Sequence, residues 1–386
     1  MKGNQGKAET GMKPLVFALY FFCLLAFSIL PLPVFALVRG QIDTTNRENR
    51  PLAAFPVFAE TGVAGFPAGL DAFFTDHLPF KNQLAVLGGL IDYKVFKSSA
   101  SGSVLVGKNG FLFYKGSQLN GEDPIADYRG MNLYTEEELA EITARFSQAK
   151  EFLNQKGIRF VVLLAPNKER MYAELMPAYY GLPAKESRYH QAFACLEAAG
   201  IETLSPVEAI SAYKAAHPGE PLYFSYDTHW TRLGAYLAAS QLDKALGFEM
   251  PPLEEVERAF GEPFAEDLAI QIGLPGILAD EPIYNPYGYS PHQSEIQVNA
   301  EVTQMDGRAQ AGNDSGVLLI GDSFSTLMFP YLACNFDRSK MIIYYDYNEE
   351  VLEETAPDVV VFEIVERYLG NLTRFSIQEG IPRQVQ

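Results

Sequence analysis

Three apolar segments constrain the fold of this chain most strongly. They read IRFVVLLAP at 158–166, GVLLIG at 316–321 and PDVVVFEIV at 357–365. Polar and apolar residues hardly alternate in them, so a strand formed by any of these segments must be buried on both faces. Such strands are typical of parallel sheets that carry helices on both sides, which predicts an α/β fold.

Helical patterns connect these segments. Thr135 and Glu138 form a capping box, apolar residues follow at helical spacing, and Gly157 stands where the helix should end. We therefore expect a helix from Thr135 to Gly157, followed directly by the first of the apolar strands.

The remaining elements continue this alternation of helix and strand. Further helices are expected at 187–199, at 206–216 and directly after His229, and further strands at 201–205 and 340–346. The region 131–386 is thus predicted to be one parallel sheet flanked by helices. Residues 248–312 have little regular periodicity, and we expect a long insertion there that leaves the sheet.

The N-terminal segment 14–38 contains no charged residue and follows Lys2, Lys7 and Lys13. Its length suits a bilayer span, and the basic flank predicts a cytoplasmic N-terminus at 1–13 with the rest of the chain outside. The alternative is a cleaved signal peptide, because the VFA before Leu37 resembles a cleavage site. The length of the apolar run favours a single-pass anchor in the cell membrane. Cleavage would instead give a secreted or periplasmic protein.

A second N-terminal region, 39–130, is expected to hold a linker, one or two helices and a hairpin. The linker covers 39–60 and the helices lie within 66–100. Two apolar runs flank Asn109-Gly110, and this dipeptide is a strong signal for a β-hairpin.

Composition excludes several classes of function. The formal net charge of -18 argues against nucleic acid as a partner, because phosphate neutralisation needs clustered Lys and Arg. It also argues against a strongly anionic substrate, unless the groove is locally basic. The three cysteines form no metal-binding spacing, and no cofactor is expected. A disulfide between Cys195 and Cys334 is conceivable from the sequence.

Ser323 follows the apolar strand 316–321 on a tight turn into a helix. Ligands bind at the carboxyl ends of strands in open α/β sheets, so its hydroxyl is a candidate nucleophile. Gly321 would relieve crowding at the turn, and Asp322 would brace it. The alternative is structural: a serine that caps a helix beside an Asp-stabilised turn.

Asp227 and His229 supply what such a serine needs. Histidine can take the hydroxyl proton near neutral pH, and a carboxylate fixes the histidine tautomer. With one residue between them, both side chains would point the same way on an extended backbone. A zinc site is the alternative, but His77, His190, His217 and His292 show no ligand spacing, so no metal is expected.

The chain resembles the SGNH-hydrolase-like proteins of the alginate O-acetylation type and the related DHHW proteins. The resemblance covers most of residues 46–370, with the Asp-x-His ahead of the serine. The motifs that carry it are NRENRPLAAFP, DHLPFKNQL, VLVGKNGFLFY, LLAPNKERMYAELMP, YDTHWTRLGA and GDSFS. It implies an SGNH-hydrolase-like (flavodoxin-like) sheet domain, with Ser323 as nucleophile, His229 as base and Asp227 as its orienting acid.

The resemblance also implies a setting. Members of the family are extracytoplasmic and membrane-anchored, and they acetylate an exported polysaccharide beside a membrane-bound O-acyltransferase. Two features depart from the family pattern: the sequence reads Asp-Thr-His-Trp without the second histidine of DHHW, and no C-terminal carbohydrate-binding module follows the last strand. The acceptor sugar is therefore open, and the acidic charge disfavours alginate.

Four further residues are candidates for the site. Asn167 and Lys168 follow the strand 158–166, so Asn167 would donate to the oxyanion and Lys168 would hold an acidic group; the alternative is a Pro-Asn turn with a solvated lysine. Trp230 and Tyr287 are candidates for stacking on a sugar, but the favoured readings are a core anchor for Trp230 and an aromatic loop packed on its own core for Tyr287.

Three functions follow from these residues. The leading hypothesis is an O-acetyltransferase that works through an acyl-Ser323 intermediate. A carbohydrate esterase would use the same residues with water as the acceptor. The third is a non-catalytic scaffold of a polysaccharide export complex, for which Ser323 would be dispensable.

Overall fold

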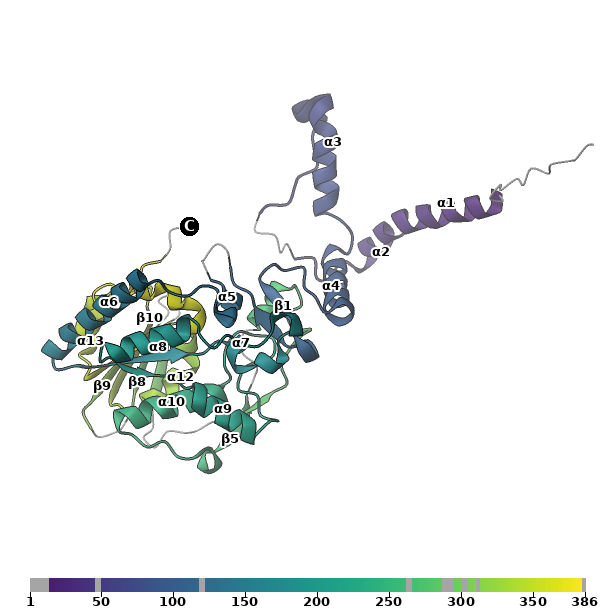
Figure 1. Ribbon diagram of the computed structural model, residues 1–386. Helices are drawn as coiled ribbons and strands as arrows, with labels where there is room; N and C mark the ends of the chain where they lie inside the picture. The colour runs from purple at the N-terminus through teal and green to yellow at the C-terminus, as the bar shows by residue number, and fades with distance from the viewer. Residues whose placement is uncertain are drawn as a thin grey trace, which may run out of the picture. The chain divides into compact units, whose positions relative to one another are not determined.

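The computed structural model describes residues 14–45, 50–117, 122–261, 266–286, 295–299, 304–309 and 313–383, and the chain divides into two units. The units are Met1–Ile91 and Asp92–Gln386. The expected hairpin therefore packs within the second unit, together with the sheet (Figure 1).

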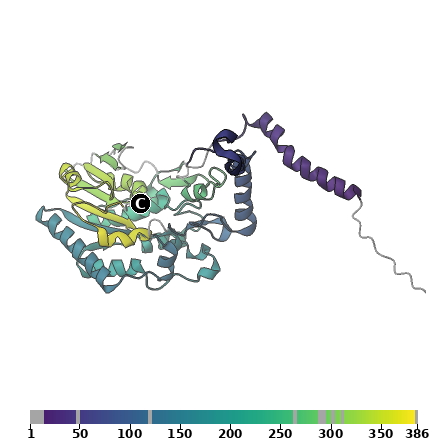
Figure 2. The ribbon, with the colours of Figure 1, turned by 90° about the horizontal axis from the view of Figure 1, so that it is seen from above.

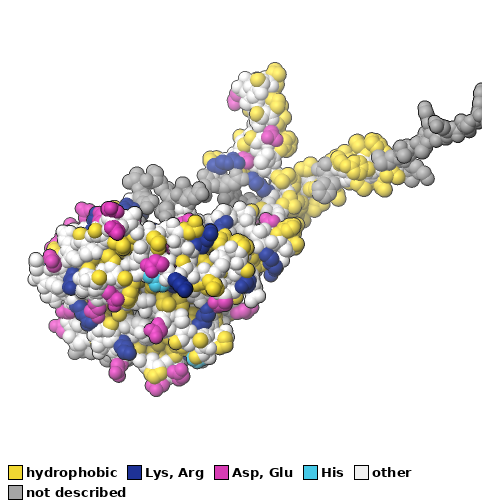
Figure 3. Space-filling model, viewed as in Figure 1, with side chains coloured by type: hydrophobic (Ala, Val, Ile, Leu, Met, Phe, Trp, Pro, Cys, Tyr) yellow, Lys and Arg dark blue, Asp and Glu magenta, His cyan; other side chains and the backbone are white. Residues whose placement is uncertain are grey.

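The first unit is helical. Its helices are α1 (Pro14–Ile29), α2 (Pro31–Val38), α3 (Phe58–Asp76) and α4 (Lys81–Ile91). The stretch Val16–Val38 has 23 residues and is long and apolar enough to cross a membrane, by length and composition. Its apolar side chains are exposed, as Figure 3 shows along α1 and α2. No residue of α2 is buried, although the Phe35 ring contacts Phe80 with centroids 5.4 Å apart, so burial inside the unit does not explain the apolar composition of this helix.

The second unit is built on a seven-stranded sheet in the order β4-β3-β11-β9-β10-β8-β7. The first five strands run parallel, as expected from their apolar sequences. Their bounds are β3 (Arg159–Ala165), β4 (Glu202–Leu204), β9 (Gly316–Gly321), β10 (Arg338–Ile343) and β11 (Val359–Val365).

The insertion does not leave the sheet entirely, which corrects one expectation. Its strands β7 (Glu295–Asn299) and β8 (Gln304–Arg308) pair antiparallel, and β8 extends the sheet next to β10. The sheet is therefore mixed. The insertion also forms a separate pair of strands, β5 (Arg258–Gly261) with β6 (Ile283–Pro286), and the short helix α11 (Asp267–Gln271).

Helices cover both faces of the sheet (Figures 1 and 2). One core holds every second residue of β3 with residues of the helices on that face, and the other core holds the alternate residues. The first face carries α7 (Lys168–Met171), α9 (Val207–Ala216), α10 (Arg232–Leu246) and α12 (Ser323–Ala333). The second carries α6 (Glu136–Gln155), α8 (Arg188–Ala198), α13 (Glu349–Thr355) and the 3-10 helix η6 (Glu366–Arg374).

Local signals behave as the sequence predicts. The capping box at Thr135 forms, and Gly157 follows α6 with a φ of +77°. The hairpin pairs β1 (Val104–Val106) with β2 (Leu112–Tyr114), and Asn109 and Gly110 both adopt positive φ. The three cysteines are free, so the conceivable Cys195–Cys334 disulfide is absent.

Candidate active site

Ser323 lies at the carboxyl end of β9, where the chain turns into α12. Asp322 caps this helix, and its carboxylate accepts hydrogen bonds from the backbone N–H of Phe324 at 2.9 Å and of Val365 at 2.7 Å. Gly321 is required by a close approach, because a Cβ there would lie 2.1 Å from Ser325 Oγ. The turn therefore has the construction that the Gly-Asp-Ser sequence predicts.

A buried acid supports this turn from the neighbouring strand β11. Glu363 Oε2 accepts from Ser325 Oγ at 2.7 Å and from the Asp322 N–H at 3.2 Å. Its other carboxylate oxygen is buried without a hydrogen-bond partner in the described chain. Burial raises the pKa of Glu363 well above its ordinary value, which favours the neutral form of this acid under the serine turn.

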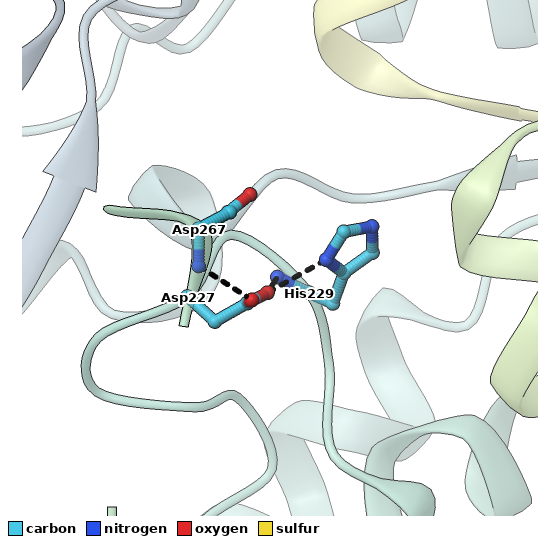
Figure 4. A group of neighbouring side chains, drawn as sticks. All are labelled: Asp227, His229 and Asp267. Carbon is cyan, nitrogen blue, oxygen red and sulfur yellow. Dashed lines mark hydrogen bonds and ion pairs between the residues drawn. The ribbon is translucent and has the colours of Figure 1, made fainter. Parts of the chain in front are cut away.

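His229 links Ser323 to Asp227. Its Nε2 lies 2.7 Å from Ser323 Oγ, and its Nδ1 lies 2.6 Å from Asp227 Oδ1. Figure 4 shows the second of these contacts and a further hydrogen bond to Asp227 from the Asp267 N–H. Burial disfavours the charge of Asp227, but hydrogen bonds from His229 and from backbone N–H groups outweigh it, so its pKa falls to about 2.

The Asp227–His229 segment is a tight loop, not the extended backbone expected from its sequence. A bridge between Tyr223 and Trp230 closes the loop, and Asp227 Oδ1 also accepts the backbone N–H of His229 at 2.9 Å. A carboxylate that binds the N–H two residues on is an Asx-turn. This local hydrogen bond therefore brings the side chains of Asp227 and His229 together.

Trp230 is a structural connector and does not offer a surface for sugar stacking. The side chain is fully buried, and its Nε1 donates to the carbonyl of Phe324 at 3.0 Å. Its ring packs edge-on against the Phe324 ring with centroids 4.9 Å apart. The residue after the histidine thus binds the residue after the serine, which fixes the base against the nucleophile.

Lys168 is also placed differently from the expectation, because it is buried and points at backbone. Its Nζ donates to the carbonyls of Ser225 at 3.0 Å and Asp227 at 2.9 Å, and it lies 4.0 Å from the centre of the Phe111 ring. Burial lowers the pKa of Lys168 to about 8. The lysine therefore holds the loop that carries Asp227 and does not reach solvent to hold a substrate acid.

Two acids of the insertion hold the same loop, and sequence reasoning missed both. Asp280 accepts from the N–H groups of Ser225 and Tyr226 at 2.8–3.2 Å. Asp267 accepts from the N–H and the hydroxyl of Thr228 at 2.8 and 2.6 Å. Single acids in an irregular stretch carry no motif, so no sequence signal distinguishes them.

Asp227, His229 and Asp267 also satisfy the geometry of a possible metal site. One ligand atom from each lies within 4.8 Å of the others. However, the carboxylate oxygens of both aspartates already accept hydrogen bonds from the loop and from His229. A metal ion would have to compete with these bonds, so the arrangement favours a hydrogen-bonded Ser-His-Asp chain.

Asn167 and Tyr287 complete the set of candidates. Asn167 stands at the N-cap position of α7, but its side chain does not bond to that helix. Its Oδ1 accepts the Arg367 N–H at 3.1 Å, while its buried Nδ2 has no partner in the described chain. Its donation to an oxyanion stays a prediction. Tyr287 lies outside the described residues.

Residues 104–338 match the family model described as SGNH hydrolase-like domain, acetyltransferase AlgX. A relative named probable alginate O-acetylase AlgJ, from Pseudomonas syringae pv. tomato, is 26% identical over 346 residues. The alignment covers 83% of this chain and 83% of the relative.

Two solved structures share the fold. A DHHW family protein from Eubacterium siraeum gives a TM-score of 0.51 at 14% identity, over 73% of this chain and 99% of that protein. PatB1 from Bacillus cereus gives a TM-score of 0.50 at 13% identity, over 71% of this chain and 99% of that protein. At these identities the likeness concerns the fold alone.

Proposed function

Because the chain belongs to the SGNH hydrolase-like family of the acetyltransferase AlgX, we propose that it is an O-acetyltransferase acting on an exported or cell-surface polysaccharide. The reaction would pass through an acyl-Ser323 intermediate. The observation that carries this proposal is the contact of His229 with both Ser323 at 2.7 Å and Asp227 at 2.6 Å. The relative from Pseudomonas, named an alginate O-acetylase, supports the reaction class.

In the first step, Ser323 Oγ attacks the carbonyl carbon of the acyl donor while His229 Nε2 takes the hydroxyl proton. The tetrahedral intermediate collapses, the bond from carbon to the leaving group breaks, and His229 returns the proton to that group. Asp227 remains ionised at neutral pH because its pKa is about 2, so it stabilises the imidazolium of His229.

The developing oxyanion needs donors that are already in position. The backbone N–H of Ser323 is one candidate, since Ser323 is the first residue of α12 and the N–H of Phe324 already binds Asp322. The side-chain amide of Asn167 is the other candidate, because its buried Nδ2 lacks a partner among the described residues.

In the second step, a sugar hydroxyl attacks the acyl-serine and His229 takes its proton. The bond from the acyl carbon to Ser323 Oγ breaks, and Oγ recovers a proton from His229. If water attacks instead, the same residues perform ester hydrolysis. The two functions therefore differ in the acceptor and not in the triad.

The stretch Val16–Val38 supports a location at the membrane. We propose that it anchors the protein with the sheet domain outside the cytoplasm, where exported polysaccharide is accessible. In this setting a membrane-bound O-acyltransferase would supply the acyl group.

The test uses the full chain in detergent with 4-nitrophenyl acetate as the acyl donor. We expect a burst of 4-nitrophenol, an intact-protein mass increase of one acetyl group, and loss of both in Ser323→Ala. Acetylated oligosaccharide would then form when acceptors are added. Acetate release with every acceptor, and no acetylated sugar, would leave only the esterase. No burst and no acyl-enzyme in the wild type would contradict the catalytic proposal and favour a scaffold.

A further inference from the structure

We infer that the cavity beside Ser323 is an acceptor subsite for an uncharged oligosaccharide, an inference that rests on the proposed transferase function. The cavity has a volume of about 460 Å³, which is in the range of small-molecule sites. Of the triad residues, Ser323 alone lies in its wall. A ligand in this cavity would approach the nucleophile without displacing the loop that carries His229.

The topology of the sheet places the cavity across the ends of three neighbouring strands. β9, which ends before Ser323, lies between β11 and β10. Tyr368 follows β11 and Tyr345 follows β10, and both line the cavity. The segments that follow the two strands flanking β9 therefore each supply a tyrosine to the cavity that Ser323 lines.

The two tyrosines suit a sugar ring. Both are half-buried, so each ring is fixed by its surroundings and still exposes part of its surface to the cavity. Tyr345 packs edge-on against the buried Tyr344, with ring centroids 4.5 Å apart. A tyrosine offers an apolar face with a polar edge, and a pyranose has apolar C–H faces with hydroxyls around its rim, so the two surfaces are complementary.

The charges of the wall disfavour a uronate. The cavity is lined by the acids Glu122, Asp322 and Asp346, and its only cationic wall residue in the described chain is Arg383. Arg383 already forms an ion pair with Asp346. Asp322 in turn lies near the buried Arg367. A carboxylate on the sugar would therefore meet the Glu122 carboxylate and, in the described wall, no cation that lacks an acidic partner, whereas hydroxyl groups can hydrogen-bond to Glu122 and Asn371.

Arg367 is a buried cation that packs against Tyr368 of the cavity wall. Arg367 is 7% exposed and is not part of the cavity wall. Its guanidinium carbon lies 5.0 Å from the ring centres of both Phe324 and Tyr368. Burial opposes its charge, and Tyr368, Asp322 and Asp267 stabilise it, so the charges of Arg367 and Asp322 offset each other.

The first test compares acceptors on the full-length wild type with 4-nitrophenyl acetate as the donor. The acceptors are cello- and N-acetylchito-oligosaccharides, and mannuronate oligomers of matched length. We expect the acceptor kcat/KM for at least one uncharged series to exceed that for the oligouronate by ~10-fold or more, the ratio of a single unfavourable interaction of about 1.4 kcal/mol.

The second test changes the tyrosines. Tyr345→Ala and Tyr368→Ala should each raise the KM for the sugar acceptor by ~10-fold. The nitrophenol burst of each variant is measured as well, because it reports acyl-enzyme formation separately from acceptor binding. Tyr179→Ala is the matched control, because Tyr179 is 75% exposed and lies outside the cavity wall. It should leave both quantities unchanged. Binding is measured separately by calorimetry with the same sugars on Ser323→Ala, where no turnover interferes.

The outcomes separate the two proposals. Tighter binding or faster acetylation of the oligouronate, no binding of any uncharged sugar, or unchanged acceptor KM in both tyrosine variants would overturn the subsite. In each case a wild-type burst with an acyl-enzyme keeps the proposed chemistry intact. Absence of that burst would instead reject the function on which the subsite depends.

Discussion

The two segments that meet at the reactive centre are built in opposite ways. The Ser323 turn connects β9 to α12 and is held by its own helix cap and by Glu363 on the adjacent strand. The Asp227–His229 loop belongs to no helix or strand. It is held by Lys168 from one side and by Asp267 and Asp280 of the insertion from the other.

This contrast separates two requirements of a serine-dependent site. The nucleophile needs an exposed hydroxyl at a fixed point, which a strand-to-helix turn provides from local sequence. The base and its acid need a fixed orientation toward that point, and here long-range polar contacts provide it. Trp230 joins the two segments through its bond to the Phe324 carbonyl.

The largest effect should come from removing the groups that meet. Ser323→Ala and His229→Ala should each lower acyl-enzyme formation by at least ~10³-fold without loss of thermal stability, because either change breaks the proton transfer. Burst kinetics and the melting temperature measure the two properties. His77→Ala, an exposed histidine of the first unit, is the control. Activity retained in Ser323→Ala would exclude the acyl-serine.

The second prediction tests whether Asp280 of the insertion positions the loop that carries Asp227 and His229. Asp280→Ala should lower kcat by about 10²-fold, since small displacements of catalytic groups have effects of this size. Glu281→Ala changes the adjacent exposed acid and is the matched control. Equal kcat in both variants would mean that the loop keeps its geometry without Asp280.

Lys168 gives a smaller effect that depends on pH. Its pKa is lowered to about 8, so the ammonium that holds the Ser225 and Asp227 carbonyls is lost as pH rises through that value. Wild-type kcat should therefore decline on the alkaline side with a midpoint near this pKa. Lys168→Met should lower the pH-independent value of kcat by ~10-fold and should remove the alkaline decline. The same alkaline midpoint in Lys168→Met would assign the decline to another group.

The smallest effect is expected from a change of Glu363, the buried acid that supports the Ser323 turn. Burial raises the pKa of Glu363 and favours its neutral form, so we expect Glu363→Gln to keep both the shape and the charge of this side chain. Its unfolding free energy should change by less than about 1 kcal/mol, whereas Glu363→Leu should lose about 1–3 kcal/mol by leaving buried donors unpaired. Denaturant unfolding measures both. A severe loss in Glu363→Gln would show that the acid is charged.

Expectations from the sequence succeeded where local patterns decide the structure. The apolar strands, the Thr135 cap, the hairpin and the turn at Ser323 all depend on neighbours in the chain. For Trp230 the favoured reading, a core anchor, is the one that the structure shows, and sugar stacking is excluded by burial. Both readings of Lys168, a substrate-binding lysine and a solvated one, were wrong. Lysine became buried only because two backbone carbonyls and an aromatic ring surround its ammonium.

The sequence by itself determined the α/β class, the apolar N-terminal segment and the candidates Ser323, His229 and Asp227, because periodicity, composition and capping act over short distances. Tertiary structure alone decided that β8 and β7 extend the sheet, that Asp267 and Asp280 hold the His229 loop, and that Tyr345 and Tyr368 line one cavity with Ser323. These pairings join residues far apart in the chain. They depend on strand order and on the burial of polar groups, which a single sequence does not encode in any local pattern.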